Sequence, residues 1–515
     1  QAIGCALIID CSRYLTRLLE VNPEARTATV EPGLVLNGLN RAAAAYGLTF
    51  APDPASAERA TIGGSIANNA SGAHSILYGM AADHLLAADV VLADGSLATF
   101  TALPLDEAQR RAESGANALE AALYRTALTI RQHHAETIRS RFPRVWRRAC
   151  GYNLNYLLPW SPAAPPLWEQ VAPQWAPEGH SSAPLPYPPV HSDEINLAPL
   201  LAGSEGTLAI IRRATLRLVP KPKHTLLGIL GFDSVAEACD VVAELLAYHP
   251  SGVELIPGSL IRLARSVPAY ARQLGFVIGD PQALLVVEFA GDDLAFLQGQ
   301  AAQMKRASQH TWHKEMRLLE SPAEQQQVWN VRKVSLGLAQ SRPGDNKYVS
   351  FIEDLSVPVE HLGEFVRGIE RIFHQHATDA EIYAHASAGC LHIRPALNLK
   401  TPQGVRHLRD IAEQAVALTL NLGGAISGEH GVGLARSEWI ERAFGSEMVA
   451  LFRAIKVAAD PGNLLNPGKI LDSPPMDVNL RFGVDYRAQG WCTVLDFSSQ
   501  GGLEGAIEMC NGNGA

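Results

Sequence analysis

Residues 61–72 read TIGGSIANNASG and form the densest run of small residues in the chain. Because glycine has no Cβ, Gly63 and Gly64 let backbone N–H groups approach a phosphate or a flavin ring closely. The same residues also suit a set of tight turns that pack backbone on backbone, and one glycine run does not separate the two interpretations. The stretch decides the fold only together with motifs elsewhere in the chain.

The composition indicates the class of protein. The chain has 515 residues, of which 47% are hydrophobic and 18% are charged, as is typical of a globular protein with two or three domains. A formal net charge of −9 gives no basic field for a nucleic-acid partner. No apolar run approaches the roughly 18 residues that span a bilayer, so we expect no transmembrane segment. Seven scattered cysteines predict a reduced, cytoplasmic protein. Peripheral contact with the inner membrane and formation of a homo-oligomer both stay open.

The first part of the chain, up to about residue 222, alternates short apolar segments with glycine turns. Its pattern predicts strands at residues 6–10 and 27–33, and helices at residues 36–46 and 104–145. Residues 90–97 are expected to be a strand that runs into an Asp-Gly hairpin turn, and residues 201–218 a strand with a Gly-Ser-Glu-Gly turn. The first helix is expected to end at Gly47. A proline-rich stretch, residues 159–189, predicts an irregular surface insertion.

The sequence KPK at residues 221–223 indicates a boundary. After it, predicted strands at residues 225–232 and 284–289 alternate with predicted helices at residues 234–248 and 293–309. The alternation continues to about residue 470 and predicts an α+β domain with a largely antiparallel sheet.

Two histidines lie in residues 385–392 (HASAGCLH). If the segment forms two hairpin arms joined near Gly389, the rings of His385 and His392 can face the same side of the sheet and share a metal. The alternative is two core histidines whose hydrogen bonds are satisfied.

A carboxylate and an imidazole are adjacent in residues 427–433 (SGEHGVG). Neighbouring residues on a regular strand point to opposite faces. Glu429 and His430 can therefore serve one site only on an irregular backbone, which Gly428 and Gly431 permit.

Residues 61–72, together with residues 201–210 (LAGSEGTLAI) and 466–469 (NPGK), resemble the FAD-binding fold of the vanillyl-alcohol-oxidase type, also called PCMH-type, flavoproteins. Within that group the chain resembles the FAD-linked D-2-hydroxyacid dehydrogenases, and most closely those D-2-hydroxyglutarate dehydrogenases that are fused to an iron–sulfur domain. The family's first glycine loop would precede Gln1, so the resemblance implies a fragment truncated at both ends.

The resemblance implies an α+β chain with three parts. These are an FAD-binding domain at residues 1–222, an FAD-linked oxidase C-terminal domain at residues 223–471 that carries the substrate and metal sites, and a linker at residues 472–515 into an iron–sulfur domain. The flavin contacts that it implies are Pro52, Gly63, Gly64, Asn68, Gly72, Gly206, Ile210 and Asn466.

The resemblance also assigns His385, His392 and Glu429 as metal ligands and His430 as the base. Two imidazoles and a carboxylate suit zinc, with manganese and iron as alternatives. A bound metal would lower the pKa of the substrate hydroxyl, so that His430 can take its proton while hydride passes to flavin N5.

Three cations are candidates for holding substrate carboxylates. The family places an arginine and a lysine at the positions of Arg332, expected near the start of a helix, and Lys347; for both, the alternative is a solvated surface charge. Arg394 would favour a second carboxylate, as in D-2-hydroxyglutarate, over the methyl group of D-lactate. Its alternative is a salt bridge to Glu353 or Asp354.

The expected function is FAD-dependent oxidation of D-2-hydroxyglutarate to 2-oxoglutarate, with D-lactate or glycolate as alternative substrates. An alternative of another class is a flavin-independent, metal-dependent hydrolase or lyase, and a third is a non-catalytic flavin-binding subunit. The electron acceptor is a quinone, an electron-transfer protein or the fused iron–sulfur domain. One cysteine, Cys510, cannot hold a cluster, so a 4Fe–4S cluster is expected only in the full-length protein. Covalent and non-covalent flavin attachment both stay open.

Overall fold

The computed structural model describes residues 6–114, 117–171, 186–340 and 344–509. The chain divides into two compact units. Unit 1 contains Gln1–Lys221 and Gly428–Ser473, and unit 2 contains Pro222–Ser427 and Pro474–Ala515. The domain boundaries expected at residues 222 and 471 stay a prediction. The compact units differ from the expected domains, since residues 428–473 belong to unit 1 and not to unit 2.

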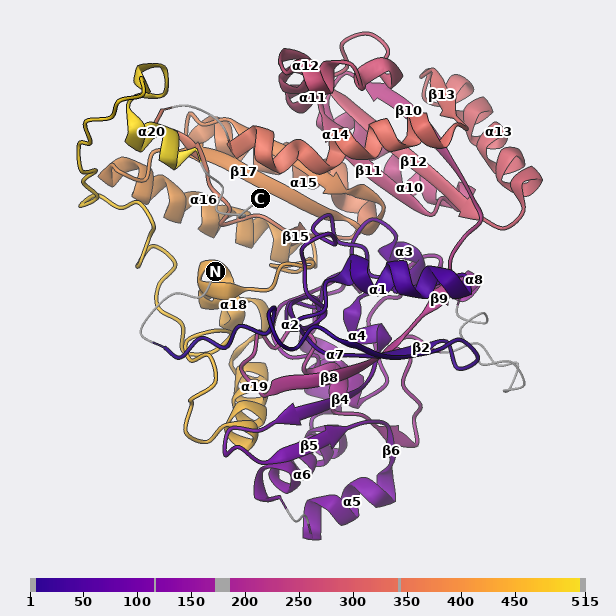
Figure 1. The fold of residues 1–515 in the computed structure, drawn as a ribbon, viewed down its shortest axis with the longest axis vertical. Helices are drawn as coiled ribbons and strands as arrows, with labels where there is room; N and C mark the ends of the chain where they lie inside the picture. The colour runs from indigo at the N-terminus through magenta and orange to yellow at the C-terminus, as the bar shows by residue number, and fades with distance from the viewer. Residues whose placement is uncertain (1–5, 115–116, 172–185, 341–343, 510–515) are drawn as a thin grey trace. The chain divides into compact units, whose positions relative to one another are not determined.

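A five-stranded sheet in the order β1-β2-β8-β4-β5 forms the centre of unit 1, and its neighbouring strands are antiparallel. Figure 1 shows β8, β4 and β5 side by side. The strands are β1 (Leu18–Asn22), β2 (Thr27–Val30), β4 (Leu85–Val91), β5 (Leu97–Phe100) and β8 (Ile210–Arg217). Two short pairs are β3 (Leu48–Thr49) with β9 (Val219–Pro220), and β6 (Leu103–Pro104) with β7 (Glu194–Ile195).

The helices of unit 1 come from both of its chain segments, and α6 packs against both α5 and α19. They are α1 (Leu36–Ala43), α2 (Ile62–Ala67), α3 (Ser75–Tyr78), α4 (Ala81–His84), α5 (Leu105–Ser114), α6 (Ala118–His133), α7 (Ala135–Arg141), α8 (Trp168–Val171), α17 (Gly433–Arg436), α18 (Ile440–Phe444) and α19 (Ser446–Ala459). The 3₁₀ helices are η1 (Ala44–Tyr46), η2 (Leu154–Leu157), η4 (Ala198–Leu200) and η9 (Ser437–Trp439).

The helix predicted at residues 36–46 is confirmed: α1 continues into η1 and ends at Gly47, whose φ of 67° is left-handed. The strand predicted at residues 6–10 was wrong, because these residues form no strand. At residues 201–218 the expected glycine turn is present, with φ values of 77° at Gly203 and 72° at Gly206, and β8 begins after it at Ile210. Part of the proline-rich stretch, residues 172–185, lies outside the described residues.

Two titratable neighbours are buried at the end of α4. Burial raises the pKa of Asp83 from 3.8 to about 6, although Tyr156 Oη and the Met80 N–H donate hydrogen bonds to its carboxylate. Burial lowers the pKa of His84 from 6.5 to about 4. Asp83 therefore stabilises the fold while it is protonated, and His84 stabilises it while it is neutral.

These shifts predict opposed contributions to stability. Asp83 loses about 2 kcal/mol of stabilisation as the pH rises from 4 to 6, and His84 gains about 3 kcal/mol as the pH rises from 4 to 6.5. Asp83→Asn removes only the first contribution. Relative to the free energy of unfolding of the unmodified protein, that of Asp83→Asn is expected to rise by about 2 kcal/mol between pH 4 and 6.5, measured by urea titration. His84→Gln should change the slope in the other direction, and parallel curves for all three proteins would contradict this account.

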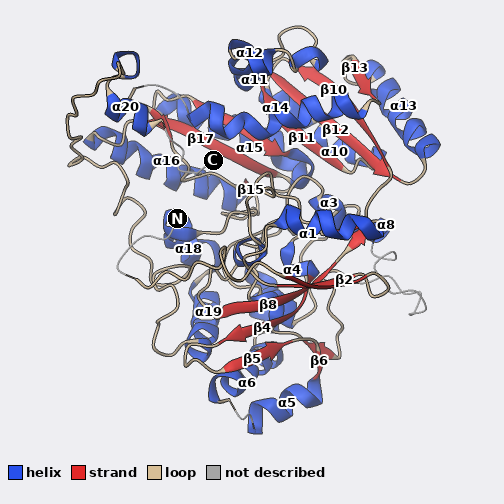
Figure 2. Ribbon diagram, viewed as in Figure 1, coloured by secondary structure: helices blue, strands red, loops and turns tan. Residues whose placement is uncertain are grey.

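The sheet of unit 2 has eight strands in the order β13-β10-β12-β11-β16-β17-β14, with β15 also paired to β17. Its neighbouring strands are antiparallel. Figure 2 shows these strands as a long sheet that carries helices along its length. They are β10 (His224–Phe232), β11 (Gly252–Pro257), β12 (Ala283–Gly291), β13 (Met316–Leu319), β14 (Lys347–Tyr348), β15 (Leu355–Ser356), β16 (Ala380–His385) and β17 (Cys390–Leu397).

The helices of unit 2 cover an apolar core that includes Ile256 of β11, Leu260 of α11 and Val328 of α14. They are α9 (Val235–Asp240), α10 (Val242–Leu245), α11 (Gly258–Ser266), α12 (Pro268–Ala271), α13 (Leu294–His310), α14 (Pro322–Gln340), α15 (Leu362–Gln375), α16 (Pro402–Asn421) and α20 (Leu503–Glu508). The 3₁₀ helices are η5 (Leu246–Tyr248), η6 (Leu274–Phe276), η7 (Val359–His361), η8 (Ala386–Ala388) and η10 (Ser498–Gln500). The predicted α+β class with a largely antiparallel second sheet is confirmed. Arg332 lies in the middle of α14, so its placement near a helix start was wrong.

Candidate flavin and metal sites

A cavity of about 570 Å³ opens in unit 1 beside the glycine-rich segment. Four of the expected flavin residues line it, namely Gly63, Gly64, Gly206 and Ile210. Residues 8–12, which were predicted in part as a strand, supply another side of the wall. The sequence did not predict them as cavity residues, because the apolar pair Ile8 and Ile9 fits a buried strand as well as a cavity wall.

The glycines of this cavity serve different purposes. A Cβ at Gly63 would lie 2.6 Å from Pro32 Cβ, so close packing alone requires glycine there. At Gly206, where φ is 72°, no described atom lies within 4 Å of the position that a Cβ would take. Turn packing therefore explains Gly63 but leaves the open space at Gly206 for a ligand.

Among the described residues, the other four expected flavin contacts lie outside this lining. Pro52 is buried beside Asp53, and a Cβ at Gly72 would lie 2.3 Å from Asp53 Oδ1. Asn68 ends α2, and its buried Oδ1 has no hydrogen-bond partner within the described chain. Asn466 donates its Nδ2 hydrogen to the Glu205 carbonyl at 2.7 Å. The unsatisfied Asn68 oxygen is the kind of group that a bound cofactor would satisfy.

Gly206→Ala tests whether this cavity holds FAD. Adding a methyl group to the cavity wall is expected to weaken FAD binding by at least roughly tenfold, measured by fluorescence titration of the deflavinated full-length protein. Gly47→Ala is the matched control, because Gly47 also has a positive φ, 67°, and open space around its Cβ position but does not line the cavity. Equal FAD affinity in the two variants would contradict the assignment of the cavity.

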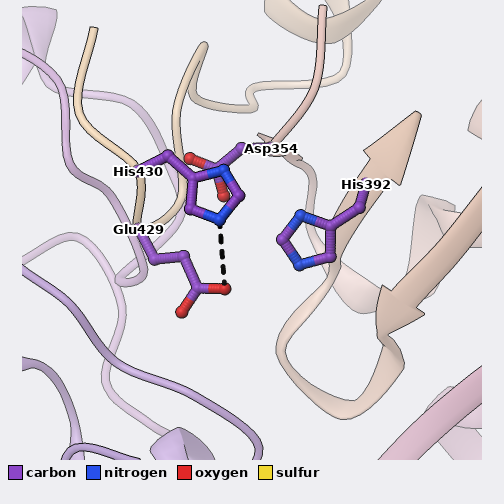
Figure 3. A group of neighbouring side chains, drawn as sticks. All are labelled: Asp354, His392, Glu429 and His430. Atoms are coloured by element: carbon purple, nitrogen blue, oxygen red, sulfur yellow. Dashed lines mark ion pairs between the residues drawn. The ribbon is translucent and has the colours of Figure 1, made fainter. Parts of the chain in front are cut away.

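The loop that carries Glu429 and His430 is irregular, as predicted, and Gly431 has a φ of 80°. Glu429 Oε2 accepts hydrogen bonds from Ser71 Oγ at 3.2 Å and lies 2.9 Å from Nη2 of the buried Arg147. Glu429 Oε1 lies 4.0 Å from His430 Nε2, the ion pair drawn as a dashed line in Figure 3. Glu429 is thus a buried, charge-compensated carboxylate beside a partly exposed imidazole.

Glu205 joins this loop to the wall of the cavity. Its carboxylate accepts the backbone N–H groups of Val432 at 2.6 Å and Gly433 at 2.9 Å. Burial raises the pKa of Glu205, and these two donors act in the opposite direction. Because Glu205 directly precedes Gly206, one carboxylate holds the His430 loop against the cavity wall.

The predicted hairpin of residues 385–392 is confirmed. β16 and β17 pair antiparallel with Tyr383 opposite His392, and Gly389 has a φ of 67° at the turn. Since residues two apart share a face of a strand, Tyr383 and His385 lie on the same face as His392. The two imidazole centroids are 5.1 Å apart.

A buried carboxylate faces Nδ1 of each of these histidines. Glu254 Oε1 lies 2.6 Å from His385 Nδ1, and Glu353 Oε1 lies 3.6 Å from His392 Nδ1. At His385 the hydrogen-bonded carboxylate leaves Nε2 as the nitrogen suited to a metal and orients the ring, whereas the distance at His392 is that of an ion pair and is too long for a hydrogen bond. The donor types present therefore fit a zinc site.

Two of the three candidate substrate cations are paired with carboxylates in unit 2. Arg332 forms an ion pair with Glu254 at 3.0 Å, and Arg394 pairs with Glu353, which was the alternative considered for Arg394. Lys347 lies in β14, where burial lowers its pKa and the Glu508 carboxylate acts in the opposite direction.

Figure 3 draws four side chains of metal-binding types, two from each unit: Glu429 and His430 from unit 1, and Asp354 and His392 from unit 2. The sequence did not predict Asp354 as a ligand. Asp354 Oδ1 accepts from Cys390 Sγ at 3.2 Å and Oδ2 from Ser427 Oγ at 2.6 Å. Its φ of 74° is unusual for a residue other than glycine.

Known proteins match both parts of the chain. Residues 1–101 match the family model of the FAD binding domain, and residues 221–470 match that of the C-terminal domain of FAD linked oxidases. Two solved structures are similar in fold. One is 4-ethylphenol oxidase from Gulosibacter chungangensis in its isoeugenol complex, with a TM-score of 0.56 and 14% identity over 90% of this chain and 80% of that chain. The other is p-cresol methylhydroxylase with substrate bound, with a TM-score of 0.54 and 13% identity over 88% of this chain and 78% of that chain. The fold is that of the PCMH-type FAD-binding proteins.

The chain therefore carries an FAD binding domain and the C-terminal domain of the FAD linked oxidases. It is 30% identical to the D-2-hydroxyglutarate dehydrogenase of Pantoea ananatis and 31% identical to that of Pseudomonas putida, in each case over 100% of this chain and 48% of the relative. It is also 25% identical to the glycolate oxidase subunit GlcD of Escherichia coli K12, over 88% of this chain and 72% of that subunit. The chain thus spans about half the length of the two dehydrogenases. Among the helices of the described residues, none combines the length and apolar character that crossing a membrane requires.

Proposed function

We propose that this chain is the flavin-binding part of an enzyme that oxidises a D-2-hydroxyacid to the 2-oxoacid, with D-2-hydroxyglutarate as the substrate. The observation that carries the proposal is the Glu205 contact. Glu205 precedes Gly206 of the cavity wall and accepts the N–H groups of Val432 and Gly433, close to His430. A base tied to a flavin cavity is what the oxidation of an alcohol requires.

The relatives support this choice of substrate, because those named D-2-hydroxyglutarate dehydrogenase match over the whole of this chain. Glycolate, with D-lactate, is the alternative that the similarity to a glycolate oxidase subunit supports. The FAD-binding match disfavours the flavin-independent hydrolase or lyase. In the proposed enzyme, Arg332, Lys347 and Arg394 bind the carboxylates of the substrate.

A divalent metal, zinc, is proposed at His385, His392 and Glu429. A bound metal would supply a positive charge that lowers the pKa of the substrate hydroxyl. Carboxylate partners at Nδ1 of both histidines support the ligand assignment.

His430 is proposed to take the hydroxyl proton at its imidazole. The neighbouring carboxylate, Glu429, is held by Arg147 and Ser71 and stabilises the imidazolium that results. Bound FAD would accept the hydride. Glu205 holds the loop that carries His430 at a constant position relative to the cavity.

The proposal includes three further predictions. The electron acceptor is a quinone, an electron-transfer protein or a fused iron–sulfur domain, and the longer protein carries a 4Fe–4S cluster. The location is cytoplasmic, with or without peripheral contact at the inner membrane. Cys510, the residue that suggested the cluster domain, lies outside the described residues.

The test is a steady-state screen of D-2-hydroxyglutarate, D-lactate and glycolate on the full-length protein with an artificial electron acceptor, before and after chelation. The proposal expects D-2-hydroxyglutarate to have the highest kcat/KM, and expects chelation to abolish turnover and added zinc to restore it. Turnover that survives complete removal of metal would contradict the metal assignment, and turnover by flavin-free protein without an acceptor would favour a hydrolase or lyase.

A further inference from the structure

Glu254 is a buried carboxylate in the middle of the sheet of unit 2. It lies on β11, all six residues of which are buried, and it stands opposite His385 in the antiparallel pairing of β11 with β16. Only 2% of its surface is exposed. A carboxylate at such a position is costly unless charged or donor groups surround it.

The two oxygens of Glu254 contact different residues. Oε1 lies 2.6 Å from His385 Nδ1. Oε2 accepts Nε of Arg332 at 3.1 Å and lies 3.0 Å from its Nη2, a two-pronged contact. The proposed metal ligand and the proposed substrate anchor are therefore held by one side chain.

The surroundings make this arrangement rigid. The Arg332 guanidinium stacks over the Tyr383 ring at 4.7 Å, and the Tyr383 ring lies 4.8 Å from the His392 ring. Glu254, Tyr383 and Arg332 come from β11, β16 and α14, so the group stands on regular elements instead of loops. Sites supported by regular elements hold their geometry better than sites on loops.

We propose that Glu254 is a positioning residue shared by the metal and substrate sites. Through Oε1 it holds His385 so that Nε2 is presented to the metal, and through Oε2 it directs the Arg332 guanidinium toward a substrate carboxylate. Binding of metal and binding of substrate are thereby linked through one carboxylate. This inference rests on the proposed function, since it takes His385 as a ligand and Arg332 as an anchor.

Glu254→Gln changes the two contacts of the side chain while its volume stays nearly the same. An amide has an acceptor oxygen at one end position and a donor NH₂ group at the other, so it cannot accept both at the position that faces His385 and at the position that faces Arg332. Glu288→Gln is the matched control, because Glu288 is also buried, on the neighbouring β12, and accepts from Ser251 Oγ at 2.9 Å. Glu254→Asp keeps the charge but shortens the reach, and provides a second variant if Glu254→Gln fails to fold.

The experiment measures two quantities on the full-length enzyme, after reduction of its flavin by D-2-hydroxyglutarate has been established. Zinc affinity is measured by competition with a chromogenic chelator, and KM and kcat are measured at saturating zinc. Glu254→Gln and Glu254→Asp are expected to weaken zinc binding by roughly 10- to 100-fold and, at saturating zinc, to raise KM by at least roughly tenfold with a smaller change in kcat. Glu288→Gln should change neither quantity.

Double variants locate each effect. In a His385→Ala background, Glu254→Gln should no longer change zinc affinity, and in an Arg332→Met background it should no longer change KM. Unchanged zinc affinity in both Glu254 variants, or an unchanged KM at saturating zinc, would overturn the shared role. A wild-type enzyme that binds no zinc, or whose flavin the substrate does not reduce, would instead refute the proposed function.

Discussion

His430→Gln is expected to lower kcat for D-2-hydroxyglutarate by roughly 10²- to 10⁴-fold, the usual contribution of a general base. The glutamine amide occupies the same loop but cannot accept the hydroxyl proton. FAD content should not change, because His430 is absent from the described lining of the cavity. Rapid-mixing measurement of flavin reduction, together with the flavin spectrum of the purified protein, gives both readouts.

His361→Gln is the control for this substitution. His361 lies at the end of η7, its side chain is 43% exposed, and its Nδ1 lies 3.2 Å from Glu364 Oε2. Its replacement should leave the rate of flavin reduction within a factor of about two. If His430→Gln reduces its flavin as fast as the His361→Gln protein, His430 is not the base.

Arg147→Met is expected to have the largest effect on stability. Arg147 is fully buried, and it contacts Glu429 at 2.9 Å, Ser75 Oγ at 2.7 Å and the Gly72 carbonyl at 2.9 Å. Removing the guanidinium leaves the Glu429 carboxylate buried without this compensation, which typically costs about 3–5 kcal/mol. Differential scanning calorimetry of the full-length protein should show a clear fall in the Tm of the transition that includes unit 1.

The cause of this fall is tested by a second substitution. Arg147→Met combined with Glu429→Gln should recover part of the lost Tm, because the uncompensated charge is then absent. Arg139→Met, at an exposed position of α7, should change stability by no more than about 0.5 kcal/mol. A double variant less stable than Arg147→Met alone would contradict the assignment of the loss to the buried charge.

Local patterns in the sequence predicted local geometry well. The spacing of His385 and His392 about Gly389 was sufficient to predict the hairpin, because strand faces repeat every two residues. The glycines around Glu429 and His430 likewise predicted an irregular loop. The strand prediction for residues 6–10 was wrong, because an apolar strand pattern does not show whether a partner strand is available.

The partners that complete the candidate sites could not be predicted in this way. Glu254 contacts His385 across 131 positions of the sequence, and Glu205 contacts Val432 across 227. No periodicity relates such pairs, because they meet only when strands and loops from distant segments pack together. Arg394 shows the same limit: the sequence allowed both a substrate contact and a salt bridge, and only the fold placed Glu353 beside it.

The most direct test of the central claim is anaerobic mixing of the full-length protein with D-2-hydroxyglutarate while the absorbance of its oxidised flavin is followed. The proposed function predicts that the flavin band bleaches within the time of one turnover and that 2-oxoglutarate appears in equal amount. A flavin that stays oxidised in the metal-loaded protein, with D-2-hydroxyglutarate, D-lactate and glycolate alike, would contradict the assignment of this chain to 2-hydroxyacid oxidation.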